Sequence, residues 1–559
     1  MGDLHGVGVS AGSGVGPAVR VVDTVPEPPA GGAAGDPATE ATDALAALEA
    51  VAADLDARGR RAGGEARDVL EAQAMMARDP SIADDVATRT AGGATAARAV
   101  YDAFGAYREI LARAGEYLAA RVPDLDDIRS RAVARLLGVP APGVPPLDAP
   151  VVLVARDLAP ADTALLDPAL VRAFVTEQGG PTAHTAILAR TLGVPAVVAC
   201  PGATEIADGV TVLVDGSTGL VRIDPPETDI AQALDKDRRR RTALAGAAGG
   251  PGTTADGHRI PLYANVGGPA DVAAAVQAGA EGVGLFRTEL LFLDRADAPS
   301  EDEQAALYTQ VLDGFAGQRV VARVLDAGAD KPLPFLPHGV EPNPALGVRG
   351  LRILRACPEI LLSQLVALRR AAAQTDAELA VMAPMVADGE EAAWFADACT
   401  EAGLECPTGV MVEIPSAALR AREIVGAVDF LSIGSNDLAQ YTFAADRQLG
   451  AVAALQDPWQ PALLDLIAAA AAAAGAVGRP CGVCGEAAAD PALGCALVGL
   501  GVTSLSMTAG ALGGVRAALA AHTIEQCQAA ATAARAATSA GAARAAARAA
   551  LPELETLGL

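Results

Sequence analysis

The sequence predicts an α/β protein with a C-terminal (β/α)8 barrel and an N-terminal α/β domain into which an all-helical subdomain is inserted. Three observations lead to this prediction. The chain has 559 residues, which is too long for a single hydrophobic core. Residues 251–559 alternate short β-like runs with helical patterns eight times, as a (β/α)8 barrel requires. Between residues 40 and 138, apolar residues recur only at helical spacing.

The first part of the chain predicts one α/β domain in two pieces. The N-terminal run "GVGVSAGSGVGPAVRVV" is strand-like, and residues 140–224 alternate β-rich runs such as "PVVLVARD" and "VTVLVDG" with short helices. We expect the two pieces, 1–29 and 140–224, to form one domain. The helical patterns between them, such as "DALAALEAVAADLDARG", predict an inserted helical subdomain at 30–139.

A charged segment, "TDIAQALDKDRRRRTALAG", predicts an exposed linker helix at 225–250, before the barrel at 251–559. Its run Arg238–Arg241 allows a nucleic-acid patch, but a solvated helix end also explains it. The formal net charge of −26 argues against nucleic acid as a partner, because a phosphate backbone needs a basic footprint. An anionic substrate therefore requires a local group of arginines or a metal ion.

The expected location is the cytoplasm, without membrane insertion. The longest uniform apolar run, Ala468–Ala474, is too short to span a bilayer. The N-terminus lacks the basic start and apolar block of a secretory signal. Eight irregularly spaced cysteines in a chain of this length indicate a reducing compartment.

Polar residues follow the β-like runs of the predicted barrel. Barrel enzymes place their chemistry at the C-terminal ends of the strands. Polar loops would explain one or two such residues, but not a set with carboxylates, an amide, a thiol and arginine. The runs are "IPLYANV", "GVGLFRTE", "VVARVLDAG", "LAVMAPMV", "TGVMVEIP", "FLSIGSND", "CGVCGE" and "TSLSMTA", and the residues are Arg287, Asp326, Glu413, Asn436, Asp437, Cys484 and Glu486.

Glu413 and Asp437 end the fifth and sixth runs, so adjacent strands would bring both carboxylates to one divalent ion. Two carboxylates, with coordination sites left for water and substrate oxygens, are a common way to hold Mg²⁺ in phosphoryl chemistry. The alternative is that both acids are buried partners of arginines.

Four arginines, Arg287, Arg323, Arg349 and Arg447, lie in or beside the same runs. Arginine grips a carboxylate or phosphate through two parallel N–H donors. Arg323 lies in an otherwise apolar strand, where an unpaired charge is unfavourable. Any one of the four is explained by a surface position or a salt bridge. Together with a metal ion, they indicate a small anion that carries a phosphate and a carboxylate.

Cys481 and Cys484 form the motif "CGVC". No second pair has the spacing of a zinc site, and a redox C-x-x-C normally opens a helix in a smaller fold. Cys484 is either an acid/base thiol at the end of a strand or a small buried residue.

His184 stands in "GGPTAHTAILAR", between a turn and a helix-like run. Thr182 would be the N-cap, which places His184 in the first helical turn. There the helix dipole lowers the imidazole pKa and favours an attached phosphoryl group. The alternative is a histidine that caps the helix without a chemical role.

Taken together, the motifs resemble Enzyme I of the bacterial sugar phosphotransferase system, the phosphoenolpyruvate–protein phosphotransferase family. The likeness covers nearly the whole chain. "GGPTAHTAILAR" is similar to the phosphohistidine loop, and "EAQAMMARDP" and "DIRSRAVARLLG" are similar to the helical insertion that docks the carrier protein HPr. The barrel motifs are "GVGLFRTELLFLDR", "LDAGADKPLPFL", "VEIPSA", "FLSIGSNDLAQYTFAADR" and "CGVCGEAAADP".

The resemblance implies a role for each site residue. His184 would accept phosphate from phosphoenolpyruvate and pass it to HPr, and Cys484 would protonate the enolate to pyruvate. Glu413 and Asp437 would hold Mg²⁺. The family also dimerises through the barrel. The residues implied to bind phosphoenolpyruvate are Arg287, Arg323, Asn436, Asp437 and Arg447, with Lys331 and Arg349 completing the charged pocket.

Related families give alternatives. Pyruvate phosphate dikinase and phosphoenolpyruvate synthase also need an ATP-binding domain, for which no segment here has the length. The nitrogen-related paralogue would carry an N-terminal sensory domain. A non-catalytic regulatory paralogue would be indicated by loss of His184, Cys484 or a metal carboxylate, and all of these are present.

Overall fold

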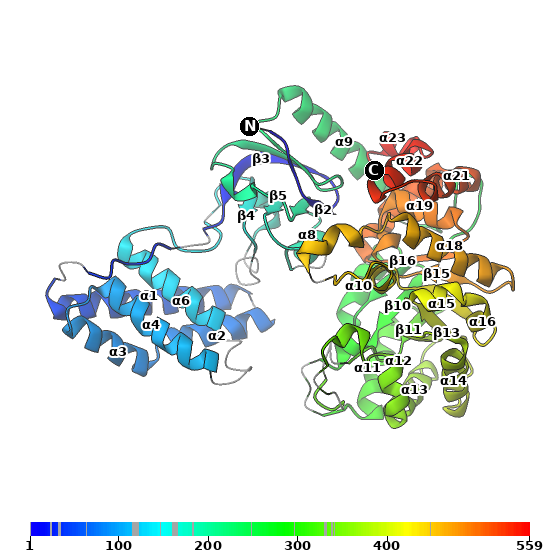
Figure 1. Ribbon diagram of the computed structural model, residues 1–559, viewed down its shortest axis with the longest axis horizontal. Coiled ribbons are helices and arrows are strands. Elements are labelled where there is room, and N and C mark those ends of the chain that lie inside the picture. The colour runs from blue at the N-terminus through cyan, green and yellow to red at the C-terminus, as the bar shows by residue number, and fades with distance from the viewer. Residues whose placement is uncertain are drawn as a thin grey trace. The chain divides into compact units, whose positions relative to one another are not determined.

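The computed structural model describes residues 2–559 except for 23–24, 32–34, 63, 114–121, 146, 159–165, 181–183, 248, 294, 296, 329–332, 337–338, 340 and 448. The chain divides into two compact units, Met1–Leu234 and Asp235–Leu559. Figure 1 shows the elements of each unit. None of the described helices is both long enough and apolar enough to cross a membrane.

The first unit contains an eight-stranded sheet in the order β1-β8-β7-β3-β4-β5-β6-β2. The N-terminal strand β3 pairs parallel with β4 and antiparallel with β7, so the two pieces of the chain form one α/β domain, as predicted. The strands are β1 (Leu4–His5), β2 (Val7–Ser10), β3 (Ser13–Arg20), β4 (Val151–Ala155), β5 (Val171–Thr176), β6 (Ala196–Val198), β7 (Thr211–Asp215) and β8 (Leu220–Ile223).

The segment between β3 and β4 is helical in the part that the structure describes, which confirms the inserted all-helical subdomain. Apolar residues at helical spacing form its core, including Leu55, Phe104 and Ile128. Asp79 caps the third helix by accepting a hydrogen bond from the Ser81 backbone. The helices are α1 (Pro37–Ala62), α2 (Gly64–Ala77), α3 (Pro80–Ala91), α4 (Ala96–Arg113) and α6 (Val122–Leu137).

Helix α9 (Glu227–Gly246) crosses the boundary between the units. All four arginines of the run Arg238–Arg241 form ion pairs with Asp235 or Asp237 of the same helix. This pairing agrees with a charged helix surface, in which two aspartates are shared by four arginines.

The second unit is a closed barrel of eight parallel strands in the order β9 to β16. All eight predicted β-like runs form its strands, which confirms the predicted barrel. The strands are β9 (Leu262–Val266), β10 (Gly282–Arg287), β11 (Arg319–Arg323), β12 (Glu378–Ala383), β13 (Thr408–Val412), β14 (Phe430–Ile433), β15 (Cys481–Val483) and β16 (Ser504–Met507).

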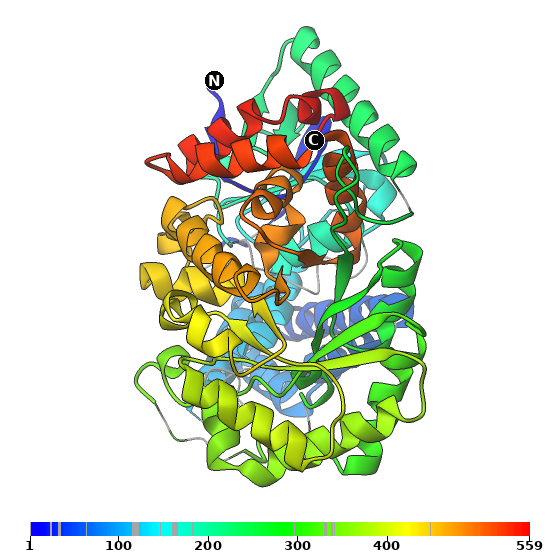
Figure 2. The same cartoon turned by 90° about the vertical axis from the view of Figure 1, so that its right-hand side faces the viewer.

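Helices cover the outside of this barrel (Figure 2). They follow the strands as (β/α) units require, and four further helices follow β16. They are α10 (Pro269–Gln277), α11 (Glu301–Asp313), α12 (Leu351–Ala356), α13 (Pro358–Ala372), α14 (Gly389–Glu401), α15 (Pro415–Leu419), α16 (Ala421–Val425), α17 (Ser435–Phe443), α18 (Pro461–Gly475), α19 (Pro491–Gly499), α20 (Leu512–Ala521), α21 (Ile524–Arg535), α22 (Ala540–Ala549) and α23 (Glu553–Leu557).

The strands bury both faces, as expected for a parallel barrel. Residues that point outward join the core under the helices. Residues that point inward form a separate cluster, which includes Met382, Met411 and Phe430. Gly409 leaves space for the ring of Phe430, because a Cβ at Gly409 would lie 2.5 Å from that ring.

Candidate active site

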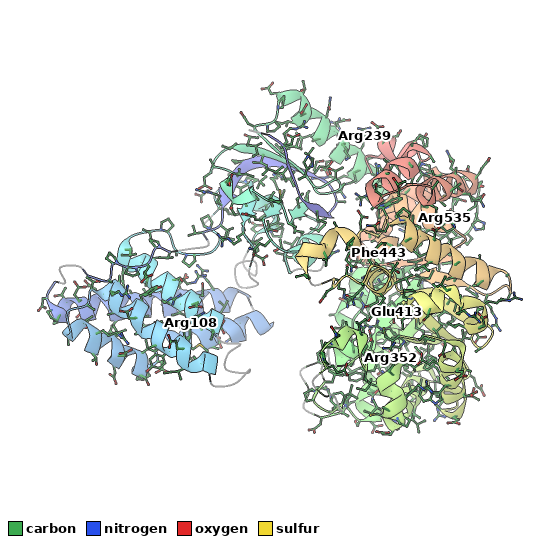
Figure 3. All side chains as sticks on the ribbon, in the orientation of Figure 1. Arg108, Arg239, Arg352, Glu413, Phe443 and Arg535 are labelled. Atoms are coloured by element: carbon green, nitrogen blue, oxygen red, sulfur yellow. The ribbon has the colours of Figure 1, made fainter. Side chains whose placement is uncertain are left out.

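The C-terminal ends of the barrel strands bring charged side chains into one buried cluster, as the sequence predicts. We define the barrel-end cluster as Glu289, Arg323, Asp326, Arg349, Glu413 and Asp437, all of which are buried. Figure 3 labels Glu413, the member that follows β13. Burial of this many charges is tolerated only when they pair with each other or with a ligand.

Arg323, the last residue of β11, is held by two acids. It forms an ion pair with Glu289, from the 3₁₀ turn after β10, and Nη1 lies 3.0 Å from Oδ2 of Asp326. Burial would lower the pKa of Arg323, but the charges of Glu289 and Asp326, followed by Glu413 and Asp437, raise it. The guanidinium therefore stays charged, and most of its charge is already balanced.

Arg349 is the second guanidinium of the cluster and is almost fully buried. Its Nη2 donates to both carboxylate oxygens of Asp326, at 2.9 and 3.1 Å, and its Nη1 lies 3.4 Å from Oδ1 of Asp437. A backbone bridge joins Arg349 to Gly328. A Cβ at Gly328 would lie 2.5 Å from the Arg349 side chain, so this approach requires glycine.

Asp437 lies in the first turn of α17, directly after β14. Besides Arg349, it accepts a long hydrogen bond of 3.5 Å from Nη1 of Arg447. Arg447 is half-buried, and its backbone N–H donates to the side chain of Gln440. The structure thus brings Asp437, Arg349 and Arg447 together, and the long distances leave Asp437 loosely held.

Glu413 combines a satisfied oxygen with an unsatisfied one. Its Oε1 accepts a 2.6 Å hydrogen bond from the backbone N–H of Met385, which has a left-handed φ of 57°. Its Oε2 is buried and has no hydrogen-bond partner among the described residues. Burial, followed by the charges of Asp437 and Asp326, raises the pKa of Glu413 to about 7. A cation placed at Oε2 would remove this penalty.

The donor set fits a hard divalent cation. Within the described parts of the chain, no three His, Cys, Asp or Glu side chains are grouped to share a metal ion. Glu413 and Asp437 therefore offer two carboxylates and leave the other positions open, which suits Mg²⁺ better than zinc. Gly434 keeps the position beside Oε2 free, since a Cβ there would approach that oxygen to 2.7 Å.

Cys484 follows β15 and belongs to the inward-pointing cluster. Its thiol lies 3.6 Å from the carbonyl oxygen of Ile433. Burial raises its pKa to about 11, so the thiol is neutral near pH 7 and can donate a proton. Cys481 points the other way, into the core under the helices. The two cysteines of "CGVC" therefore do not form a redox pair.

The other predicted residues take different positions. Arg287 ends β10 and is partly exposed, and it forms no hydrogen bond or ion pair with the residues that the structure describes. Oδ1 of Asn436 accepts a 3.0 Å hydrogen bond from the backbone N–H of Glu486, so Asn436 holds the loop after Cys484. Lys331 lies outside the described residues.

His184 is the first residue of α8 (His184–Leu192), and its side chain lies outside the described part of the structure. The next residue, Thr185, is fully buried, and its hydroxyl lies 3.4 Å from Oδ1 of Asp157. Asp157 is the second residue after β4. The helix start is therefore tied to the C-terminal end of a strand of the first unit.

Sequence reasoning missed three residues of the site. Glu289 stood inside the quoted run "GVGLFRTE", and the buried arginine after the next strand was a signal that a partner was needed. Asn265 is the penultimate residue of "IPLYANV", and the strand-end rule used for the other runs would have found it. The Met385 N–H depends on a backbone conformation that no sequence pattern indicates.

Comparison with known proteins assigns both units to one class. The models of the PEP-utilising enzyme family match in three parts: the N-terminal part at residues 5–121, the mobile domain at 147–219 and the PEP-binding domain at 244–524. The chain thus consists of domains of PEP-utilising enzymes, and the barrel-end cluster lies in the PEP-binding domain.

Relatives that match over most of the chain identify one family within the PEP-utilising enzymes. The phosphoenolpyruvate-protein phosphotransferase of Streptomyces coelicolor is 65% identical over 94% of this chain and 95% of its own length. That of Haloferax volcanii is 41% identical over 92% and 94%. An NMR solution structure of Enzyme I (nEIt) covers 42% of this chain and 98% of its own, with 31% identity and a TM-score of 0.36. The chain belongs to the phosphoenolpyruvate-protein phosphotransferase family.

Proposed function

We propose that this protein takes the phosphoryl group of phosphoenolpyruvate onto His184, passes it to a histidine of HPr and releases pyruvate. The observation that carries the proposal is the barrel-end cluster, in which two buried guanidiniums lie beside an acid with an unpartnered oxygen. Such a site suits a small dianionic substrate bound together with a divalent cation.

The arginines have different roles in binding the substrate. Arg323 is already paired with two acids, so it positions the substrate but adds little net charge. Arg287 has no ion pair within the described part of the chain, so its full charge is available for the phosphate or carboxylate. Arg447 and Asn436 bind the substrate from the side of α17. Arg349 contacts Asp437, as Arg447 does. Lys331 keeps the role that the family resemblance implies.

Glu413 and Asp437 hold Mg²⁺ in this proposal. When bound, the ion supplies positive charge to the phosphoryl oxygens. Glu413 would offer the ion its Oε2, which has no hydrogen-bond partner among the described residues, and the long contacts from Arg349 and Arg447 would orient Asp437 while leaving it free to adjust.

Cys484 is the proton donor. After phosphoryl transfer, the enolate of pyruvate needs a proton at C3. The S–H bond of the neutral thiol breaks, the C3–H bond forms, and the thiolate is later protonated by water. The raised pKa of Cys484 keeps the thiol protonated until this step.

His184 is the nucleophile, at the start of α8 where the helix dipole favours an attached phosphoryl group. Because His184 and the barrel-end cluster belong to different units, the units have to approach for transfer and exclude water from the bound substrate. We further propose that HPr docks on the helical subdomain, that the barrel mediates a homodimer and that the protein works in the cytoplasm.

The test follows radiolabel from phosphoenolpyruvate to the purified protein, with and without Mg²⁺, in wild type and in His184→Ala. We expect acid-labile, base-stable label that needs Mg²⁺, is absent from the variant and moves to added HPr. A folded wild-type protein that stays unlabelled with Mg²⁺ present would contradict the proposal. The chain would then be a non-catalytic regulatory paralogue.

A further inference from the structure

We propose that Asn265 is a positioning residue for proton transfer, which holds the backbone of Cys484 so that the thiol faces one side of the enolate. The inference rests on the proposed function, because it takes Cys484 as the proton donor. Asn265 itself touches neither the substrate nor the metal carboxylates in this account. It acts through the main chain of the residue that does the chemistry.

Asn265 points into the barrel. Its neighbours in β9, Ala264 and Val266, belong to the core under the helices, so the alternation of the strand directs Asn265 to the inside. Its Nδ2 donates a 3.0 Å hydrogen bond to the carbonyl oxygen of Cys484. Since β16 lies between β9 and β15, the amide reaches across one whole strand to make this contact.

Strand β16 also holds the Asn265 amide, by a hydrogen bond to its oxygen. The hydroxyl of Ser506, in the middle strand β16, donates to Oδ1 of Asn265 at 2.6 Å. Gly284 leaves room for this pair, because a Cβ there would lie 2.5 Å from the Ser506 hydroxyl. A carboxylate at position 265 could accept from Ser506 but could not donate to Cys484, so only an amide satisfies both partners.

Three backbone N–H groups of the Cys484 loop find acceptors on the opposite side, among the residues that the structure describes. The backbone N–H of Cys484 donates to the carbonyl oxygen of Ile433 at 3.0 Å. The N–H of Glu486 donates to Asn436, and that of Ala487 donates to the Ser435 hydroxyl. These partners all belong to β14 or α17. Asn265 is therefore the side chain that restrains the Cys484 carbonyl from the β9 side.

Loss of this restraint would let the peptide group after Cys484 rotate and shift the thiol. Proton transfer to carbon depends strongly on the distance and direction of the donor, and a 1 Å misplacement can lower a rate about a hundredfold. Phosphoryl transfer uses other groups and does not need the thiol. Asn265 should therefore affect the second step and spare the first.

The experiment separates these steps in a single turnover. The substrate is phosphoenolpyruvate stereospecifically tritiated at C3, used in D₂O with Mg²⁺, and pyruvate is trapped at once as lactate. Formation of phosphorylated His184, formation of lactate and the chirality of the new methyl group are measured. The variants are Asn265→Ala, Asn265→Asp and Cys484→Ala.

Thr503→Ala is the matched control. The Thr503 hydroxyl also clamps the backbone of β15, since it lies 3.0 Å from the N–H and 3.2 Å from the carbonyl oxygen of Cys481. The substitution Thr503→Ala removes the same kind of contact at the end of β15 that is far from the thiol. A general loosening of β15 would therefore appear in both Thr503→Ala and Asn265→Ala.

For Asn265→Ala and Asn265→Asp we expect phosphorylation of His184 at close to the wild-type rate, with lactate formation reduced about tenfold to a hundredfold. The methyl group should become partly racemic, because released enolpyruvate takes its proton from either face. Thr503→Ala should keep the wild-type rate and chirality.

Two results would overturn the inference. One is fast, stereospecific protonation in Asn265→Ala. The other is an equal loss of phosphorylation and protonation, which indicates a structural role only. Failure of the proposed function looks different. Wild type itself would then not be phosphorylated on His184, or Cys484→Ala would form stereospecifically protonated pyruvate at the wild-type rate.

Discussion

At the scale of single residues, Glu413 carries an electrostatic penalty that a bound cation would remove. A buried carboxylate with one unsatisfied oxygen and acidic neighbours is unfavourable in the protein alone. The fold nevertheless keeps it, with a left-handed Met385 that directs an N–H to the other oxygen. Backbone strain of this kind is retained where the surrounding structure needs it.

We therefore predict that Glu413→Gln stabilises the metal-free protein by on the order of 1–3 kcal/mol at pH 8. In wild type, the raised pKa of Glu413, about 7, means that the folded state holds a proton that the unfolded state has lost. The contribution of Glu413 to the free energy of unfolding is therefore largest below about pH 4.5 and is lost as the pH rises through 7. The advantage of the variant should thus grow over this range.

Thermal unfolding of both proteins between pH 5 and 8, with EDTA present, measures this difference. Added Mg²⁺ should raise the midpoint of wild type and leave that of Glu413→Gln unchanged. A variant less stable than wild type at pH 8 would show that Glu413 is not under electrostatic strain.

Cys484 gives the second prediction. Burial raises the pKa of the thiol to about 11, and a proton donor works only in its protonated form. Ionisation of Cys484 should therefore not lower the rate of pyruvate formation between pH 7 and 9. The same pKa predicts slow alkylation by iodoacetamide at pH 7.5, which rises about tenfold per pH unit up to pH 10 because the thiolate is the nucleophile.

Mass spectrometry of the peptide that contains Cys484 measures this alkylation, with N-acetylcysteine as the reference thiol. The alkylation rate of the reference should level off about one pH unit above its own thiol pKa, and that of Cys484 should still be rising there. A plateau for Cys484 near pH 8 would mean that its thiol is solvated and poorly suited to hold a proton.

At the scale of elements, the ends of parallel strands explain why much of the site was predictable. Arg323, Glu413 and Asp437 each end or follow a strand, and a closed barrel brings such ends together whatever the helices do. The pairing within the cluster was not predictable. Arg323 pairs with Glu289, whereas the Arg287 side chain has no ion pair among the described residues. This difference depends on a 3₁₀ turn and on side-chain directions, which periodicity does not encode.

Asp326 carries the third prediction, because it joins the loop after β11 to the rest of the barrel end. It is fully buried and accepts from both Arg323 and Arg349. Asp326→Ala leaves two buried guanidiniums short of a partner, so the barrel unit should lose about 3–5 kcal/mol of unfolding free energy.

Urea unfolding followed by a probe of the barrel tests this value. The matched control is Asp465→Ala, which breaks the exposed ion pair with Arg535 on the same barrel and should change the free energy by less than about 1 kcal/mol. Equal effects of the two substitutions would contradict a structural role for the buried network.

At the scale of the whole molecule, the chain has separate hydrophobic cores. The clusters of the first unit contain only residues up to Ile223, and those of the barrel begin at Ile260. The sequence predicted this division from the charged linker segment at 225–250 and from the eightfold alternation of β-like runs and helical patterns that follows it. How the units approach each other is not a property of local patterns and was not predictable from them.

Separate cores lead to the last prediction. Calorimetry of the full chain should show two unfolding transitions, because each unit has its own core. Mg²⁺ at a hundred times its Kd should stabilise only the barrel transition, by about 2.7 kcal/mol, and raise its midpoint by a few degrees. Glu413→Gln should abolish the shift, and His184→Ala should leave it intact, since His184 lies in the other unit. A single transition that Mg²⁺ moves as a whole would instead show that the two units unfold together, so that binding at the barrel end stabilises both.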